Sequence, residues 1–276
     1  MSNAPYDALA AVAGWPVETA AVGVTSAAVV LAETGPLDEA LPLASVTKLI
    51  TAVAVLVAVE EETIGLDDPA GPEGSTVAHL LAHASGLGFD GARLTTPGRR
   101  RIYSNAGFEA LGDLVAARSG IPFETYVTEA VLQPLGMAGT RMGNPAWGAV
   151  GTAADLLALG RELLRPQVLS PTMLARASAV AFPGLDGVVP GFGRQSPCDW
   201  GLGFEIRDGK GPHWTGSRNS AATFGHFGRS GTFLWVDPHA GLACACVTDR
   251  EFDTWAAEVW PVLSDEVVST FGSHGV

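Results

Sequence analysis

One run of apolar residues dominates the first quarter of the chain. Residues 49–59, "LITAVAVLVAV", end at three successive glutamates. The run is shorter than the ~18 residues that a membrane span needs, so it predicts a buried helix of a globular protein. Four further stretches have helical periodicity, several with Ser or Thr before the first turn or Gly after the last. These predicted helices are 75–85, 106–120, 122–136 and 152–165.

Strand patterns occur at both ends of the chain. Residues 19–35 are rich in Val and Ala and predict a hairpin of short strands. After Trp200 the strand patterns return, and Asp237, Pro238 and Gly241 predict a turn between two strands. These later stretches are 201–209, 222–228 and 231–249. Residues 1–16 predict an amphipathic helix, and residues 251–272 predict a final helix that is broken or kinked at Pro261.

Strands at both ends with helices between them predict an α+β fold, an α/β sandwich. We expect one antiparallel sheet that is assembled from both termini, flanked by helices, with an all-helical lobe inserted. Residues 1–48 and 195–276 would form the sheet lobe, and residues 49–194 would form the mainly helical lobe. This arrangement predicts an active site in the cleft between the two lobes.

Composition narrows the range of functions. With 276 residues, of which 47% are hydrophobic, the chain can bury a substantial core. A net charge of -13 argues against nucleic-acid binding, which depends on clustered Lys and Arg, and against an anionic membrane surface. The start of the chain lacks the basic and longer apolar segments of a secretory signal, and no run is long enough to span a bilayer. We therefore expect a cytoplasmic protein.

The three cysteines fit this expectation, because an odd number suits a reducing compartment better than a disulfide framework. Cys244 and Cys246 lie two apart in a predicted strand and therefore face the same side. No further metal ligands lie nearby in the sequence, so we interpret both as small buried hydrophobic residues. No metal or organic cofactor is implied.

The first candidate catalytic residues are Ser45 and Lys48, which are three residues apart. If a helix starts near Ser45, the hydroxyl and the amine share one helix face. A serine nucleophile needs a base, and a lysine serves as one only when its pKa falls from ~10.4 toward 7 to 8. Desolvation by the apolar run, or another cation, must supply most of that shift, because helix-dipole effects are only about 0.3 to 1 kcal/mol. Tyr103 and Asn105 add a phenol that can relay a proton and an amide that can hold a substrate carbonyl.

Several motifs in order resemble one family. "SVTK" at Ser45, "LLAHASGL" at 80–87 and "PGRRRIYSNAGFEALG" at 97–112 are followed by "VLQPLGM", "GTAADLLALG" and "FGHFGRSGTFLWVDP". This series, which covers about 45–249, resembles the serine beta-lactamase and penicillin-binding protein superfamily. The similarity is to its class C-like branch of esterases, D-aminopeptidases, DD-peptidases and class C beta-lactamases. The resemblance implies a beta-lactamase/transpeptidase-like fold and acyl transfer in two steps, ending with water.

The resemblance also implies a role for each matching residue. Ser45 would be the acylated nucleophile, with Lys48 and Tyr103 sharing the general acid and base work. Asn105 would bind the amide or ester side group of the substrate. His226 and Gly228 would form the third motif, and the backbone N–H groups of Ser45 and Arg229 would form the oxyanion hole.

The chain departs from the family pattern at several positions. Ala82 and Ala84 replace the threonines that are usual in the stretch at 80–87. His226 stands where beta-lactamases commonly have lysine. A histidine is mostly neutral at pH 7 and anchors a carboxylate weakly, which favours neutral esters or amides. The alternatives are a histidine that is merely hydrogen-bonded at a strand edge, and a rival third motif at residues 214–216.

Other charged groups near these motifs favour simpler interpretations. Arg99, Arg100 and Arg101 precede Tyr103, and a cation there would lower the pKa of the phenol or attract an acidic substrate. We favour a solvated loop face for these arginines. His79 and His83 have the spacing of metal ligands on a helix, but without a third ligand we expect them to pack in the core or on a helix.

Three functions follow from the motifs. The leading hypothesis is a serine hydrolase that acts on small esters or amides. The second is a beta-lactamase or DD-peptidase of the cell wall, and the third is a non-catalytic, penicillin-binding-like sensor. The partner in each case is a small-molecule ester, amide or beta-lactam.

Overall fold

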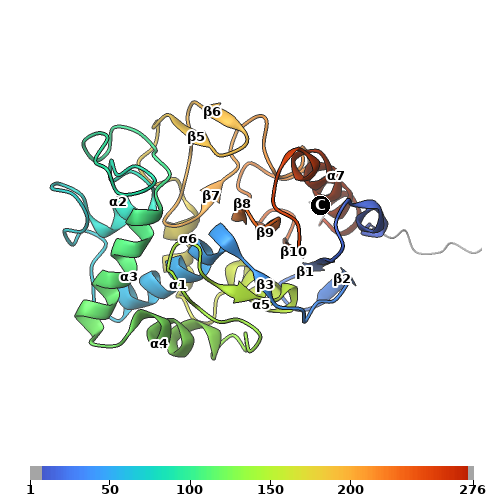
Figure 1. Cartoon of the computed structure of the whole chain (residues 1–276), viewed down its shortest axis with the longest axis horizontal. Helices are drawn as coiled ribbons and strands as arrows, with labels where there is room; N and C mark the ends of the chain where they lie inside the picture. The colour runs from blue at the N-terminus through green and yellow to red at the C-terminus, as the bar shows by residue number, and fades with distance from the viewer. Residues whose placement is uncertain (1–7, 273–276) are drawn as a thin grey trace, which may run out of the picture.

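The computed structural model describes residues 8–272 and has one large sheet between layers of helix (Figure 1). The strand order is β2-β1-β10-β9-β8-β7, and every neighbouring pair is antiparallel. The first two strands come from the beginning of the chain and the other four from its end. The prediction of an α+β fold with a sheet from both termini is therefore confirmed. The strands are β1 (Ala20–Thr25), β2 (Val30–Thr34), β7 (Glu205–Ile206), β8 (Phe224–Gly228), β9 (Thr232–Asp237) and β10 (Leu242–Thr248).

The sheet buries both of its faces, as the alternation along β10 shows. Ala243 and Ala245 belong to the core on one side, where α5 (Ala153–Leu164) packs on β1, β9 and β10. Cys244 and Cys246 belong to the core on the other side, together with Trp residues of α7 (Thr254–Phe271). Both cysteines are free and buried, which confirms their interpretation as small hydrophobic residues.

The helical block lies to one side of the sheet and α7 to the other (Figure 1). Its central helix, α1 (Thr47–Glu60), is buried at every position from Thr47 to Ala58, as the apolar run predicted. Ser104 caps α3, because its Oγ accepts from the N–H of Gly107 at 3.1 Å, and Gly120 ends α3 in the left-handed region with a φ of 72°. The block contains α2 (Val77–Leu81), α3 (Asn105–Ser119), α4 (Phe123–Val127), the π-helical turn η3 (Thr128–Leu132) and α6 (Pro171–Ser178).

Two small sheets escaped the sequence analysis because their strands have only two or three residues. The strand β3 (Leu41–Pro42) pairs with β4 (Val150–Gly151) beside the start of α1. The strands β5 (Gly187–Val189) and β6 (Gly193–Gln195) form a hairpin that stands apart from the main sheet (Figure 1).

Both terminal helices differ from their predictions. Residues 1–7 lie outside the described residues, and from residue 8 the predicted amphipathic helix is only a 3-10 turn, η1 (Ala10–Gly14). Gly14 and Pro16 both disfavour a longer helix. At the other end α7 runs through Pro261 without a break, so the predicted break is wrong and the alternative, a kink, stays a prediction. Buried Trp260 and Leu263, on either side of the proline, anchor both halves of the helix in the same core.

The lobe boundaries at residues 48 and 195 stay a prediction. The helix α5 falls inside the range assigned to the helical lobe, although it covers one face of the sheet. Across residues 8–272, no helix combines the length and apolar character that crossing a bilayer requires.

Candidate active site

Ser45 lies on a tight turn that leads into the buried helix. The turn is the 3-10 helix η2 (Ala44–Val46), and Ala44 has a left-handed φ of 44°. A non-glycine residue in this region stores backbone strain of the kind that clusters at functional sites. Ser45 is partly exposed and lines a cavity of about 760 Å³.

Lys48 is fully buried in the first turn of α1. Its Nζ donates to Asn105 Oδ1 and to the backbone oxygen of Ala146, both at 2.7 Å, and lies 4.7 Å from the centre of the Tyr103 ring. Burial lowers the pKa of Lys48 from 10.5 to about 7, against a smaller opposing effect of the Glu109 carboxylate. The amine is therefore substantially neutral at neutral pH, as a general base must be.

Tyr103 lies directly before α3 and faces both Ser45 and β8. The Ser45 hydroxyl hydrogen-bonds to the Tyr103 phenol, and the phenol oxygen lies 3.5 Å from His226 Nε2. Burial raises the pKa of Tyr103 well above its ordinary value of 10, and the hydrogen bond from Ser45 opposes this only partly. The phenol therefore keeps its proton at neutral pH and can donate it.

His226 lies in the middle of β8 and is buried. Its Nδ1 lies 2.6 Å from the backbone oxygen of Phe227, which places the ring proton on Nδ1 and leaves Nε2 as an acceptor. Burial, followed by the charge of Lys48, lowers the pKa of His226 to about 3. The imidazole is neutral at pH 7.

Gly228 ends β8 where that strand touches the turn that carries Ser45. A Cβ added at Gly228 would lie 2.5 Å from the backbone oxygen of Leu43, so no larger residue fits without a shift. Thr232 Oγ1 donates a hydrogen bond to the same oxygen at 2.9 Å. The next residue, Arg229, lines the cavity with Ser45, and its exposed side chain pairs with Glu251 at 3.3 Å.

The structure thus brings the seven residues singled out in the sequence to one place. Ser45, Tyr103, His226 and Arg229 line the cavity itself. Lys48 and Asn105 lie behind Tyr103 and contact each other. Gly228 joins β8 to the Ser45 turn.

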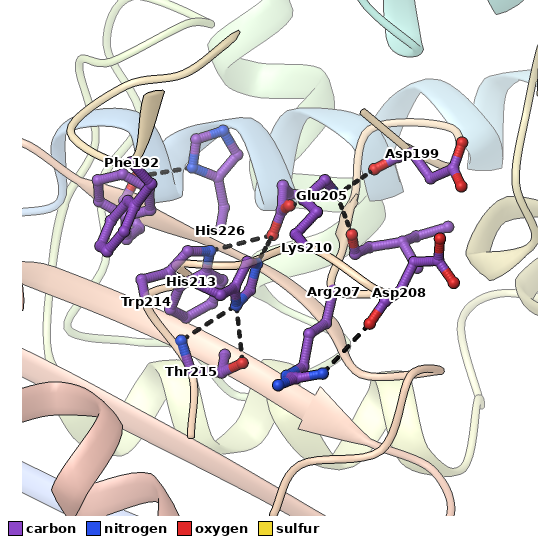
Figure 2. Close-up of polar contacts among 12 residues, drawn as sticks. Phe192, Asp199, Glu205, Arg207, Asp208, Lys210, His213, Trp214, Thr215 and His226 are labelled. Atoms are coloured by element: carbon purple, nitrogen blue, oxygen red, sulfur yellow. Dashed lines mark hydrogen bonds and ion pairs between the residues drawn. The ribbon is translucent and has the colours of Figure 1, made fainter. Parts of the chain in front are cut away.

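The rival third motif at residues 214–216 contacts Glu205, which lines the cavity, but does not line the cavity itself. Trp214 is buried, and its Nε1 donates to Glu205 Oε2 at 3.0 Å, in a cluster that also contains Lys210 and His213. Figure 2 shows these side chains converging on the Glu205 carboxylate from the loop between β7 and β8. Burial alone would raise the pKa of Glu205, but His213 and Lys210 lower it to about 2. The residues 214–216 are not part of the cavity wall.

Arg101 corrects one expectation about the arginines before Tyr103. Arg99 and Arg100 are exposed, as a solvated loop face requires, but Arg101 is buried. Its guanidinium donates to the backbone oxygens of Ala82, Ala181, Phe182 and Cys198. Three arginines in a row indicated exposure. Nothing in that pattern distinguished Arg101, which connects the Tyr103 loop to residues 181–198.

The sequence analysis assigned no functional role to several residues that shape the site. His83 is buried, with a φ of 53°, and its Nδ1 accepts from the N–H of Ser104 at 3.2 Å. Its ring packs on Tyr103 at 4.6 Å between centroids, so it contacts two successive residues, Tyr103 and Ser104, of the loop before α3. The position of His83 in the family stretch at 80–87 was the available signal. Trp200 and Glu205, which also line the cavity, had none.

His79 packs at the surface rather than in a metal site. Its ring stacks on Phe182 at 4.2 Å and its Nδ1 lies 2.9 Å from Thr76 Oγ1. Within residues 8–272, no three His, Cys, Asp or Glu side chains come together as a metal site.

Comparisons with known proteins give the family and the fold. The family model described as Beta-lactamase matches residues 8–268. A crystal structure of a beta-lactamase from Mycobacterium bovis is 53% identical, covers 96% of this chain and 100% of its own, and superposes with a TM-score of 0.95. Simvastatin synthase LovD from Aspergillus terreus, as the LovD9 mutant, shares the fold at a TM-score of 0.79, with 18% identity and 95% and 96% of the two chains covered.

A more distant match is partial. The D-alanyl-D-alanine-carboxypeptidase/endopeptidase AmpH of Escherichia coli K12 is 28% identical over 142 residues. That match spans 38% of this chain and 37% of AmpH, so the chain covers well under half of that relative. The family match over nearly the whole chain, together with the fold, shows that the chain belongs to the beta-lactamase family, whose members have a serine-hydrolase fold.

Proposed function

We propose that this protein is a serine hydrolase that forms an acyl-enzyme on Ser45 and acts on small-molecule esters or amides. The observation that carries the proposal is the environment of Lys48. The amine is buried, its pKa is lowered to about 7, and it contacts the Tyr103 ring whose phenol hydrogen-bonds to Ser45. A buried lysine with this pKa is suited to proton transfer at neutral pH.

Lys48 is the better general base of the two candidates. A neutral amine has two N–H groups and one lone pair, and Asn105 and Ala146 accept one hydrogen bond each. The lone pair is then left to accept a proton. A neutral phenol is a weaker base than a neutral amine. The phenolate form of Tyr103 is disfavoured, because burial raises the pKa of Tyr103. Tyr103 instead relays protons between Ser45, Lys48 and the leaving group.

The proposed reaction balances in two half-reactions. The Ser45 proton passes to Lys48, directly or through Tyr103, while Oγ attacks the substrate carbonyl carbon. The resulting oxyanion is held by the N–H groups of Ser45 and Arg229, a kind of contact typically worth about 2.7 to 4 kcal/mol per donor. The bond to the leaving group breaks as Tyr103 donates a proton and regains one from Lys48. Water then gives a proton to Lys48 and attacks the acyl carbon. The bond to Ser45 Oγ breaks as Oγ takes that proton back from Lys48, directly or through Tyr103, which releases the acid and restores the free enzyme.

Asn105 and His226 complete the proposed site. Asn105 holds Lys48 through Oδ1 and offers its amide nitrogen to the substrate. The neutral His226 is a hydrogen-bonding group rather than a carboxylate anchor, which supports esters and amides without a negative charge.

A beta-lactamase or DD-peptidase activity is the second candidate. It is supported by the 53% identical Mycobacterium bovis beta-lactamase and by the partial match to AmpH. Faster turnover of a chromogenic cephalosporin than of p-nitrophenyl acetate or butyrate would place this candidate first.

The experiment that tests the leading proposal is labelling with a fluorophosphonate, followed by intact mass spectrometry and peptide mapping. We expect one adduct, on Ser45, that disappears in Ser45→Ala. Ser178→Ala, which alters a serine of α6 outside the cavity wall, serves as the matched control and retains the adduct. No adduct on the wild-type protein, or an adduct that survives Ser45→Ala, contradicts the proposal.

A further inference from the structure

The cavity beside Ser45 is larger and more apolar than an acetyl group needs. Its volume of about 760 Å³ is within the range of drug-sized ligand sites. Trp200, Phe227 and Phe252 supply an aromatic wall. Aliphatic groups also line it, including part of the β5–β6 hairpin, with Ile102, Val188, Val189 and Pro190.

The lining of this cavity also includes large apolar side chains that are exposed to solvent. Phe89 is 54% exposed, Leu94 is 64% exposed and Val188 is 53% exposed, and all three line the cavity. They come from two segments that are distant in the sequence, and folding brings both segments to the same cavity. Exposed apolar groups gathered at the rim of a pocket indicate a surface that binds an apolar ligand.

Three of the four charged side chains that line the cavity are already engaged. The Arg101 guanidinium donates hydrogen bonds to four backbone oxygens. Glu205 is paired with Lys210 and His213 (Figure 2). Arg229 pairs with Glu251 in water. The strand that carries His226 presents a neutral ring. Three cations line the cavity. Arg100 and Arg229 are exposed, and Arg101 is occupied by backbone oxygens. None of these three is therefore a buried, free partner for a substrate carboxylate.

From this lining we infer that the site selects neutral esters with a bulky, apolar acyl group, which lies between the Trp200 and Phe252 wall and the β5–β6 hairpin. The inference rests on the proposed hydrolase function and narrows it. The acyl group stays bonded to Ser45 through both half-reactions, whereas the leaving group departs after the first. The cavity wall beside Ser45 therefore contacts the acyl group during both half-reactions. Each methylene that the cavity buries should raise kcat/KM about fourfold, the equivalent of about 0.8 kcal/mol.

The test compares kcat/KM for p-nitrophenyl acetate, butyrate, hexanoate and octanoate, which share one leaving group. We expect a rise with each step until the cavity is filled. The p-nitrophenyl hemisuccinate, equal in carbon number to the butyrate, should react at least tenfold more slowly. Val188→Glu and Leu94→Glu place a carboxylate at the mouth and should lower the octanoate-to-acetate ratio about tenfold. Val29→Glu is the matched control, because Val29 is 57% exposed and lies outside the cavity wall.

The outcomes separate this inference from the function on which it rests. Hydrolysis that depends on Ser45 but is flat or falling with acyl length overturns the apolar acyl pocket and leaves the hydrolase intact. The pocket is equally overturned if Val29→Glu changes the octanoate-to-acetate ratio as much as Val188→Glu does. If preference instead follows the size of the alcohol in a series of acetate esters, the assignment to the acyl group is wrong. Absence of any Ser45 adduct overturns both proposals.

Discussion

Lys48 donates to Asn105 Oδ1 over 2.7 Å, and this contact joins the first turn of α1 to the first residue of α3. The contact couples two sequence motifs that are 57 residues apart. It also positions the amine next to the Tyr103 ring, two residues before Asn105. The geometry therefore makes Asn105 a positioning residue for the proposed base as well as a proposed substrate contact.

Replacing Asn105 by Asp tests this coupling. A carboxylate beside the amine favours the ammonium and should raise the pKa of Lys48 by ~1 to 3. The acid limb of the pH profile of kcat/KM should then move to higher pH. The rate at pH 7 should fall about fivefold for the first pH unit that the limb moves and about tenfold for each further unit. Asn105→Ala, which adds no charge, should lower the rate without moving the limb upward. Identical limbs in the wild type and in Asn105→Asp would show that Lys48 is not the titrating base.

Gly228→Ala tests the contact between β8 and the Ser45 turn. The added Cβ would lie 2.5 Å from the Leu43 oxygen and would push the two proposed oxyanion amides apart. We expect kcat to fall ~10²- to 10³-fold with a smaller change in KM, and unfolding to become easier by about 1 to 3 kcal/mol. Gly209→Ala is the control, because nothing lies within 4 Å of a Cβ there. Full activity in Gly228→Ala would contradict the proposed role of this close approach.

His83→Asn tests the support that His83 gives to the loop carrying Tyr103. Asparagine tolerates the left-handed φ of 53° but removes the ring that packs on Tyr103. We expect slower labelling of Ser45, about tenfold or more, with the midpoint of the acid limb unchanged, because burial lowers the pKa of His83 well below 6.5 and keeps it neutral. His79→Asn, four residues earlier, should label normally. A shifted midpoint in His83→Asn would instead mean that His83 titrates with the site.

The buried ion pair of Glu205 with Lys210 gives a prediction about stability. The pKa of Glu205 is lowered from 4.5 to about 2, so its contribution is complete above pH 4.5 and is lost as the pH falls toward 2. Glu205→Gln leaves Lys210 without its anion and should cost about 3 to 5 kcal/mol at pH 7. Glu251→Gln, which removes only an exposed ion pair, should cost less than about 1 kcal/mol. Urea denaturation at pH 7 and at pH 3 measures both differences.

The sequence was most informative where it contained long apolar patterns or uncommon motifs. The apolar run predicted α1 because all of its faces are buried, and the Val- and Ala-rich ends predicted the sheet. The motifs also identified the residues that meet at the cavity, since each carries an uncommon combination of side chains. The turn predicted at Asp237 indicated that β9 pairs with β10, but it carried no information on the pairing of β8 with β9, through His226 and Leu234.

Burial of individual polar groups was harder to predict. Arg101 and Lys210 occur in polar stretches of the sequence, yet both are buried by segments distant in the fold. The extent of the lowering of the Lys48 pKa likewise depends on Asn105 and Ala146 closing over the amine, which no local pattern encodes. The apolar lining of the cavity combines residues from 89 to 252 and becomes visible only when the chain is folded.

The central claim is that Lys48, with its pKa near 7, removes the proton from Ser45. The most direct measurement is the single-turnover rate of Ser45 acylation by a p-nitrophenyl ester from pH 5 to 9, followed by intact mass. His226, with a pKa of about 3, and Tyr103, whose pKa is raised above 10, do not titrate in this range. We predict a rate that rises tenfold per pH unit below a midpoint near 7 and then levels off, and that Lys48→Met abolishes. A rate independent of pH over this range, or one that survives in Lys48→Met, would contradict the account.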